Sequence, residues 1–492
     1  MNSAVTILAL DAGEQWREIH GAIPPEDEAT WYVFADSHAV LSPQLAGLLR
    51  IHGAERPEVD IFYGDEVITR APGESSQYLC KPGFDQTQLL AQDYIGLPLA
   101  VRRRAMATLG DLDASTGTAR CYDMLLRAIV AGNGIDRITE VLAVNPMQAF
   151  HSIANDRLIA LRRAVPQIYP DCEIVPGLTD NTFQLRRKFD DYPDVTLIIP
   201  TRQGVYQGAN VKDPGQPMIL GLLDGLCQAD WPTDRIHVLI GDDQEDGSIY
   251  ESRSWPFRLD RMVTTRPADE AFNYAKKVNT LWRAARTEYL IFLNDDLLVR
   301  EPEWIGALMT FATDESVGGV GARLLFPDGT IQHAGMPLGV LGPCTHAFIG
   351  MPASKPTYQN WALVHREWSV ATGAVFATRR SVLAQVNGLD ERFSLNYNDV
   401  DLCLRLRSLG YRIVYTPHAE LTHVESASRG KERSPAEQTA LFMEKWQDYL
   451  QNDPAYHPRM TRETSDIRPV LRAHEWWRTF VAHSAEKIGN AR

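Results

Sequence analysis

Short runs of apolar residues alternate with more polar, helix-like segments across residues 195–430. Three of these runs, at 195–199, 236–240 and 289–293, have the length and composition of buried strands in an α/β sheet. Residues 370–378 have the pattern of a fourth strand. Because the segments between the strands have helical periodicity, we predict βαβ connections and a mostly parallel sheet.

A helix is predicted over residues 399–409, where the leucines fall on one face. Asn398 or Asp399 can cap its start, and Gly410 can supply the left-handed residue that ends it. Residues 412–416 then have the pattern of a further strand.

Three sequence blocks occur twice in the same order, which indicates an internal duplication. The paired blocks are 32–38 with 291–296, 103–113 with 379–390, and 121–127 with 399–405. The front copy has His38 in place of Asp296 and Cys121 in place of Asp399. Only about 30 residues precede its first strand–acid junction, against about 100 in the second copy, so we expect it to lack two βα units and to be non-catalytic.

These patterns divide the chain into four predicted parts. They are a degenerate α/β domain at 1–150, a charged connector at 151–194, a complete α/β domain at 195–430, and a helical C-terminal extension at 431–492 that contains Trp446, Trp476 and Trp477.

Composition narrows the class of protein. The chain has 492 residues, which is more than a single hydrophobic core accommodates and predicts two or three domains. Of these residues, 44% are hydrophobic. The net charge of −14 argues against nucleic acid as a partner. The six scattered cysteines fit reduced thiols, and neither a signal peptide nor a run of roughly 20 apolar residues is visible. We expect a cytoplasmic protein, and peripheral contact with the inner face of the membrane stays open.

The candidate chemistry lies where the predicted strands end. Ligands bind at the carboxyl ends of strands in such sheets. Small polar groups at Thr201 and Arg202 can hold a base or ribose, and Asp242 can accept a hydrogen bond from a pyrimidine. Asp295 and Asp296 suit ribose and a diphosphate held through Mg²⁺ or Mn²⁺.

Asp399 opens the predicted helix, whose dipole favours an ionised carboxylate that can act as a general base. Each of these residues also has a structural interpretation. Asp399 alone is more often a helix cap, Asp242 a loop acid, His423 a core histidine, and Arg405 an ion-pair partner. The functional hypothesis depends on their joint order.

Residues 195–430 resemble a family 2 glycosyltransferase with the GT-A fold. The matching blocks are VTLIIPTRQG, FNYAKKVN, EYLIFLNDDLLV, RLLFPDGTIQHAG, TGAVFATRR, NGLDERF, NDVDLCLRLRSLGYRIVYTPHAELTH and ESASRG. Several of them resemble the bacterial O-antigen and rhamnan branch, in which a degenerate glycosyltransferase-like half often precedes the full domain.

The resemblance implies a role for each candidate residue. Asp296 becomes a metal ligand and His423 a further one, while Asp399 becomes the catalytic base. The implied nucleotide-sugar contacts are Thr201, Arg202, Asp242, Asn279 and Asp295. Two positions depart from many relatives, because Asn294 stands where they have aspartate and Asn398 where they have glutamate.

The sequence therefore predicts an inverting, metal-dependent glycosyltransferase of surface-polysaccharide synthesis. Its implied donor is a nucleoside-diphosphate sugar, with dTDP-rhamnose or another pyrimidine-linked sugar favoured, and its acceptor is a glycan or lipid-linked hydroxyl. The alternative is a non-catalytic sugar-binding scaffold in a polysaccharide assembly complex. A dehydrogenase fits poorly, because no GxGxxG follows the first strand. The sequence does not define the oligomeric state.

Overall fold

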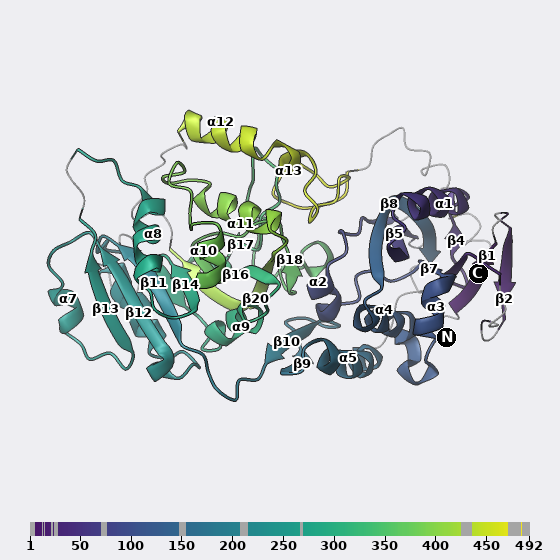
Figure 1. The fold of residues 1–492 in the computed structure, drawn as a ribbon, viewed down its shortest axis with the longest axis horizontal. Coiled ribbons are helices and arrows are strands. Elements are labelled where there is room, and N and C mark those ends of the chain that lie inside the picture. Colours follow the sequence, from purple (N-terminus) through teal and green to yellow (C-terminus); the bar gives the residue numbers. More distant parts are fainter. Residues whose placement is uncertain are drawn as a thin grey trace. The chain divides into compact units, whose positions relative to one another are not determined.

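The computed structural model describes residues 5–11, 13, 15–20, 23, 28–69, 76–146, 154–206, 215–265, 269–424, 435–470 and 484 (Figure 1). The chain forms two compact units. Unit 1 comprises Met1–Leu185, His457–Thr461 and Arg468–Arg492, and unit 2 comprises Arg186–Tyr456 and Arg462–Ile467.

Unit 2 is built on a ten-stranded sheet. Its strands lie in the order β13 (Arg258–Val263), β12 (Ile236–Asp242), β11 (Val195–Thr201), β14 (Tyr289–Leu293), β19 (Val375–Arg379), β16 (Val317–Leu325), β20 (Arg412–His423) and β15 (Leu297–Val299). In addition, β17 (Ile331–His333) pairs with β16, and β18 (Arg366–Glu367) pairs with β20. The apolar runs predicted as buried strands are thus β11, β12 and β14.

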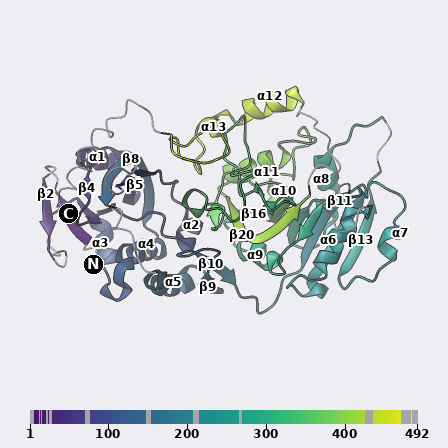
Figure 2. The same ribbon diagram turned by 180° about the vertical axis from the view of Figure 1, so that it is seen from behind.

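The helices of unit 2 connect and cover this sheet. They are α6 (Met218–Leu226), α7 (Ser248–Glu251), α8 (Tyr274–Ala284), α9 (Trp304–Ala312), α10 (Arg380–Gln385), α11 (Asn398–Ser408), α12 (Ala436–Lys445) and α13 (Gln447–Gln451). Helix α6 lies between β11 and β12 in the chain, and α8 lies between β13 and β14; both are labelled in Figure 2. The chain thus steps outward from β11 to β12 and returns from β13 to β14, and the usual right-handed crossovers would put the two helices on opposite faces of the sheet.

Helix α8 shows how local sequence fixes these positions. Asn273 precedes the helix, and its side-chain oxygen accepts the N–H of Lys276 at 2.9 Å, a standard N-cap. Leu281, from the buried face, packs against Gly241, where a Cβ atom would lie only 2.6 Å from the leucine side chain. The missing side chain of Gly241 therefore lets α8 approach β12 closely, beside the strand end that carries Asp242.

The sheet is parallel through its first four strands and mixed beyond them. Strands β11, β12, β13 and β14 pair in parallel, whereas β19 is antiparallel to both β14 and β16. The strand predicted at 370–378 is present only as 375–379. Residues 373 and 374 instead turn their backbone toward other groups: Gly373 donates to Asp399, and Ala374 accepts from Asn294.

The helix predicted at 399–409 is α11, and Gly410 has the expected positive φ, +89°. The predicted caps are wrong. Tyr397 precedes the helix in a left-handed conformation, φ +64°, and makes no side-chain cap. Asn398 bonds back to the carbonyl of Leu395, and the Asp399 carboxylate accepts the N–H groups of Val400 and Gly373, so neither closes the helix start.

Unit 1 contains an eight-stranded sheet. Its strands lie in the order β2 (Trp16–Ile19), β1 (Val5–Leu10), β3 (Trp31–Asp36), β7 (Leu99–Arg102), β5 (Val59–Thr69), β8 (Gly134–Pro146) and β4 (Val40–Leu41), with β6 (Gln77–Leu79) on β5. Its helices are α1 (Leu45–Glu55), α2 (Gln86–Ala91), α3 (Arg103–Leu109), α4 (Arg120–Ala131) and α5 (Ala154–Ile168).

The two sheets share one topology, as the inferred duplication requires. Strands β3, β7, β5, β8 and β4 correspond to β14, β19, β16, β20 and β15, and every neighbouring pair has the same sense in both units. The register agrees as well, because Trp31 faces Arg102 where Tyr289 faces Arg379. In place of β11 and β12, unit 1 has the antiparallel strands β1 and β2, so two βα units are missing from its described residues.

The predicted connector at 151–194 contains α5 and the strands β9 (Cys172–Pro176) and β10 (Phe183–Arg187), which pair with each other. The C-terminal extension is helical in α12 and α13, and the described residues 452–470 that follow contain no helix. Trp476, Trp477 and the ESASRG block at 425–430 lie outside the described residues. The exact domain boundaries stay predictions. No helix in the described part of the chain is long and apolar enough to cross a membrane.

Candidate functional site

The carboxyl ends of β11, β12 and β14 meet at one edge of the unit 2 sheet. Thr201 lies opposite Asp242 in the parallel register of β11 and β12. The Thr201 hydroxyl donates to Asp295 Oδ2 at 2.6 Å, which ties the end of β11 to the residues that follow β14. The sheet therefore brings Thr201, Asp242 and Asp295 together, as predicted, and Arg202 follows Thr201 as an exposed residue.

Asp242 is fully buried and accepts four hydrogen bonds. The donors are Gln203 Nε2 at 2.9 Å, Tyr250 OH at 2.9 Å, Arg261 Nε at 3.0 Å and the backbone N–H of Gln244 at 3.0 Å. Arg261 offsets the buried charge, because a lone carboxylate would be costly there. A nucleobase reaches this carboxylate only by displacing a donor, so the Tyr250 and Arg261 side chains belong to the same candidate surface.

Lys277 on α8 was missed by the sequence analysis. Its ammonium group donates to the Thr201 carbonyl at 2.7 Å and to Asp243 Oδ1 at 2.7 Å. Burial lowers its pKa, and the Asp243 carboxylate opposes that shift. The sequence feature that could have identified Lys277 is its place in the FNYAKKVN block, because it is a charged residue on the buried face of an amphipathic helix.

Asn279, from the same block, has a structural role instead of the implied nucleotide contact. Its amide nitrogen donates to the Leu389 carbonyl and to Glu391 Oε1, both at 2.9 Å. Its amide oxygen accepts from Trp282 Nε1 and from the Leu389 N–H, also at 2.9 Å. All four hydrogen-bonding positions of the amide are thus used to hold α8 against residues 389–391.

The charged form of the Asp295 carboxylate is disfavoured by its surroundings. Burial raises its pKa to about 6, and the neighbouring Asp296 carboxylate adds to the rise, while the Thr201 hydrogen bond opposes it. Two adjacent carboxylates with this little solvent favour a cation or hydrogen-bond donors beside them.

Asp296 meets His423 at the same place. Asp296 Oδ1 lies 2.9 Å from His423 Nε2, and the two residues are only 5% and 8% exposed. Strand β15 sets this contact by pairing Leu297 with His423 in an antiparallel register. The other ring nitrogen of His423, Nδ1, donates to Gln332 Oε1 at 2.6 Å, which turns the lone pair of Nε2 toward Asp296.

This donor set fits a divalent cation. A carboxylate oxygen and an imidazole lone pair 2.9 Å apart need a cation or a proton between them, and neighbouring ligands with bonds of about 2.1 Å around an octahedral ion lie at this spacing. Gln332 supplies the outer hydrogen bond that orients a metal-binding histidine. Asn294 lies beside them, with its Nδ2 atom 3.3 Å from His423 Nε2, so it adds a neutral donor to the site.

The Asp399 side chain is linked to the same strand end through two successive hydrogen bonds that involve the backbone of residues 373 and 374. The Gly373 N–H donates to Asp399 Oδ2 at 2.8 Å, and the next residue, Ala374, accepts the N–H of Asn294 at 3.0 Å. Asn294 directly precedes Asp295 and Asp296. The start of α11 therefore lies beside the acidic strand end, as the sequence analysis predicted.

The front copy has lost every one of these groups. The shared register places Ser37 and His38 at the positions of Asp295 and Asp296, and Asn145 at the position of His423. Cys121 corresponds to Asp399. Unit 1 keeps the five shared strands of the second copy without its candidate chemistry.

A second cluster of potential metal ligands exists in unit 1, formed by the buried residues Asp65, Cys80 and His457. The Nδ1 atom of His457 accepts the N–H of Arg459 at 3.0 Å, so the ring proton of the neutral imidazole lies on Nε2, 2.9 Å from Asp65 Oδ2. Because metal-binding histidines normally donate through the second nitrogen, we interpret this cluster as a close contact between His457 and Asp65 and not as a metal site.

A mixed sheet with a parallel first half, acids at the ends of β12 and β14, and a histidine from β20 beside them defines unit 2 as a GT-A glycosyltransferase fold. Residues 230–445 match the family described as "Glycosyltransferase like family 2".

The chain is also similar to two named proteins of polysaccharide and glycolipid synthesis. The chain is 29% identical over 458 residues to the O-antigen biosynthesis protein RfbC of Myxococcus xanthus, which covers 90% of this chain and 34% of that protein. It is 29% identical over 202 residues to the N-acetylglucosaminyl-diphospho-decaprenol L-rhamnosyltransferase of Mycobacterium tuberculosis, covering 38% of this chain and 59% of that protein. The chain thus spans about a third and three fifths of the length of these relatives.

Solved structures resemble the chain only in part. The mannosyltransferase PcManGT from Pyrobaculum calidifontis, in complex with GDP-Man and Mn²⁺, is 17% identical and has a TM-score of 0.34, with 61% of this chain and 81% of that chain covered. A score this low supports no conclusion about ligands.

Proposed function

We propose that unit 2 transfers a sugar from a nucleoside-diphosphate sugar to an acceptor hydroxyl, with inversion at the anomeric carbon and with a divalent cation. The observation that carries the proposal is the contact of Asp296 with His423 after β14, at a strand end to which Asp399 is linked through Gly373 and Ala374. Asp295 precedes Asp296, and Asp242 ends a nearby strand of the same sheet. The family match of residues 230–445 supports the same class of reaction.

Each residue has a defined part in this proposal. Asp296 and His423 would hold Mg²⁺ or Mn²⁺, which when bound neutralises charge on the leaving diphosphate. Thr201, Arg202, Asp242 and Asp295 face the nucleoside, with Lys277 behind them. The Asp399 carboxylate accepts the proton of the acceptor hydroxyl as that oxygen bonds to the anomeric carbon. The bond from the anomeric carbon to the diphosphate oxygen breaks, and its electron pair leaves with the nucleotide.

A pyrimidine-linked donor such as dTDP-rhamnose is favoured, because one relative is named an L-rhamnosyltransferase. The acceptor is a glycan or a lipid-linked sugar of a surface polysaccharide, in line with the relative named for O-antigen biosynthesis. This acceptor would bring the protein to the inner face of the cell membrane as a peripheral partner.

A direct test incubates the purified chain with a panel of nucleotide sugars and Mn²⁺ or Mg²⁺, and measures nucleotide release with and without candidate acceptors. Release that requires both metal and acceptor is expected for one pyrimidine-linked donor. The Asp296→Ala variant should bind that donor more weakly in the presence of metal. Equal donor binding by both proteins, with and without chelator, would remove Asp296 from the proposed metal site.

The second candidate function is a non-catalytic sugar-binding scaffold. One observation favours it: unit 1 preserves the five shared strands without the candidate groups, so this part of the duplicated architecture persists without chemistry. Calorimetric titration with nucleotide sugars separates the two functions when it is followed by the release assay. Tight donor binding without any release, across all acceptors tested, would favour the scaffold.

A further inference from the structure

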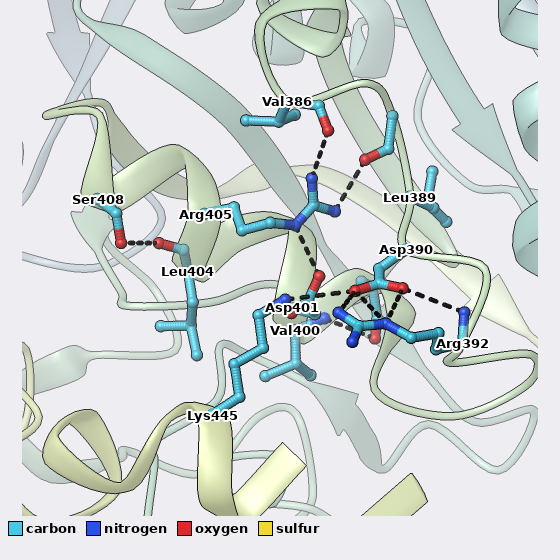
Figure 3. Close-up of polar contacts among 12 residues, drawn as sticks. Val386, Leu389, Asp390, Arg392, Val400, Asp401, Leu404, Arg405, Ser408 and Lys445 are labelled. Atoms are coloured by element: carbon cyan, nitrogen blue, oxygen red, sulfur yellow. Dashed lines mark hydrogen bonds and ion pairs between the residues drawn. The ribbon is translucent and has the colours of Figure 1, made fainter. Parts of the chain in front are cut away.

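Asp401 lies in the first turn of α11, two residues after Asp399, and is completely buried. Its carboxylate accepts from Arg405 Nε at 2.7 Å and from Lys445 Nζ at 2.6 Å (Figure 3). It also accepts from Trp446 Nε1 at 3.0 Å. Arg405 belongs to the same helix, whereas Lys445 and Trp446 come from the end of α12. The first turn of α11 is therefore attached to α12.

Half of this arrangement recurs in the front copy. Asp123 and Arg127 on α4 occupy the positions of Asp401 and Arg405, and their side chains are 2.8 Å apart. Arg127 also donates to the Leu109 and Asp111 carbonyls, as Arg405 donates to those of Val386 and Gly388. Since the front copy has no catalytic acid, this aspartate–arginine pair belongs to the fold common to both copies.

The contacts from α12 are specific to the second copy. Within the described part of the chain, no lysine or tryptophan contacts Asp123. In unit 2, Lys445 Nζ reaches Asp401 and also lies 3.3 Å from Asp390 Oδ2. The copy that carries the candidate base thus has an additional attachment at the turn that presents it.

A second set of α12 contacts acts on the residue before α11. Tyr397 has a φ of +64°, which costs free energy for a residue with a side chain. Its ring stacks on Phe442 of α12, with ring centres 4.7 Å apart and an angle of 17° between the planes. The Tyr397 carbonyl accepts the N–H of Asp401 at 2.8 Å, so the strained residue also closes the first helical turn.

We propose that residues 436–446 position the Asp399 carboxylate, and that Lys445 is the positioning residue that does so through Asp401. This proposal rests on the proposed function, because it states that the exact position of the first turn of α11 matters for catalysis by Asp399. Asp399 is fixed from one side by the Gly373 N–H, and the Asp401 contacts fix the opposite side of the same turn. Without Lys445 the turn retains its pair with Arg405 and keeps its fold, while its exact position loosens.

The test compares Lys445→Met with wild type in the full-length chain. The kcat for sugar transfer is expected to fall about tenfold, because small errors in the position of a base are costly. The KM for the donor is expected to stay within about twofold, since the donor binds at the ends of β11, β12 and β14. Lys445→Arg, which keeps a cation in reach of Asp401, should restore most of the kcat.

A matched pair of substitutions separates positioning from stability. Asp401→Asn and Asp123→Asn make the same change at equivalent positions of the two copies. Both should lower the thermal midpoint, but only Asp401→Asn should lower kcat. An equal loss of kcat in both variants, or an unchanged kcat in Lys445→Met, would overturn the positioning role.

A readout without activity keeps the two proposals distinguishable. Amide hydrogen exchange at residues 399–403 should speed up in Lys445→Met, and exchange at 121–125 in the front copy should not change. Unchanged exchange at 399–403 contradicts the positioning role even in an active enzyme. A wild-type chain that never releases nucleotide contradicts the proposed function, whatever the exchange result.

Discussion

At the scale of single residues, the site depends on contacts between side chains that are far apart in the sequence. The strand-end acids Asp295 and Asp296 were predictable, because each follows an apolar run that could only be a buried strand. Gln332 was not, since its role comes from the 2.6 Å contact with His423, 91 residues away. Tyr250 and Arg261, which donate hydrogen bonds to Asp242, were not predicted for the same reason. Asn279 was assigned to the nucleotide because a sequence block does not show which of its members face the core.

The contact between Gln332 and His423 gives a prediction about metal binding. Gln332→Met removes the acceptor that fixes the histidine tautomer but keeps a side chain of similar length. The affinity of the free protein for Mn²⁺ should fall about 10- to 100-fold, the usual effect of losing such an outer hydrogen bond. Electron paramagnetic resonance titration with Mn²⁺ measures this without any catalysis. An unchanged dissociation constant would show that His423 is not a metal ligand or is oriented by other groups.

At the scale of elements, strand positions followed from hydrophobic patterning, whereas strand sense and helix starts did not. The residues of β19 were correctly assigned to a strand, but its first residues leave the sheet because Gly373 and Ala374 bond to Asp399 and Asn294. The start of α11 is governed by the packing of Tyr397 on Phe442, which lies 45 residues later in the chain. Local capping rules could not reveal that contact.

Strand β20 carries a partly buried histidine, His418, whose titration predicts acid sensitivity. Burial lowers the pKa of His418 to about 4, and burial together with His418 holds the pKa of His365 well below its usual range. The two rings lie 4.8 Å apart, next to the pairing of β18 with β20. Between pH 6.5 and pH 4 the unfolded chain therefore binds protons that the folded chain does not, so stability is full above pH 6.5 and falls as the pH drops.

His365→Phe should weaken this dependence, because one of the two groups no longer gains a proton on unfolding. Each such group contributes about 1.4 kcal/mol per pH unit in that range. The urea midpoint of unit 2 measured at pH 8 and pH 5 should differ less in the variant than in wild type. An equal difference in both proteins would place the acid sensitivity elsewhere.

At the scale of the whole molecule, the duplication was visible in the sequence and agrees with the topology of both sheets. Paired blocks such as 121–127 and 399–405 preserve an aspartate–arginine pair in each copy while the residue at the position of Asp399 changes to Cys121. The duplication could be recognised from the sequence because each pair of blocks is short and contiguous in the chain. It could not assign Asn145 to the position of His423, since that equivalence requires the register of paired strands.

This asymmetry predicts the binding stoichiometry. Because, among the described residues, the acids and the histidine occur together only in unit 2, the chain should bind one nucleotide sugar per molecule in the presence of Mn²⁺. Isothermal titration calorimetry should give a stoichiometry near one for wild type, and Asp296→Ala should reduce the affinity of that single site. A stoichiometry near two would mean that the front copy retains a donor site.

The central claim is that Asp399 accepts the acceptor's proton at a site where the donor is held by other residues. The most direct measurement is the transfer rate of Asp399→Asn together with its donor affinity. The account predicts a loss of about 10²–10⁴-fold in kcat, the usual contribution of a general base, with the dissociation constant of the donor unchanged. Transfer at the wild-type rate, or loss of donor binding in parallel with activity, would contradict it.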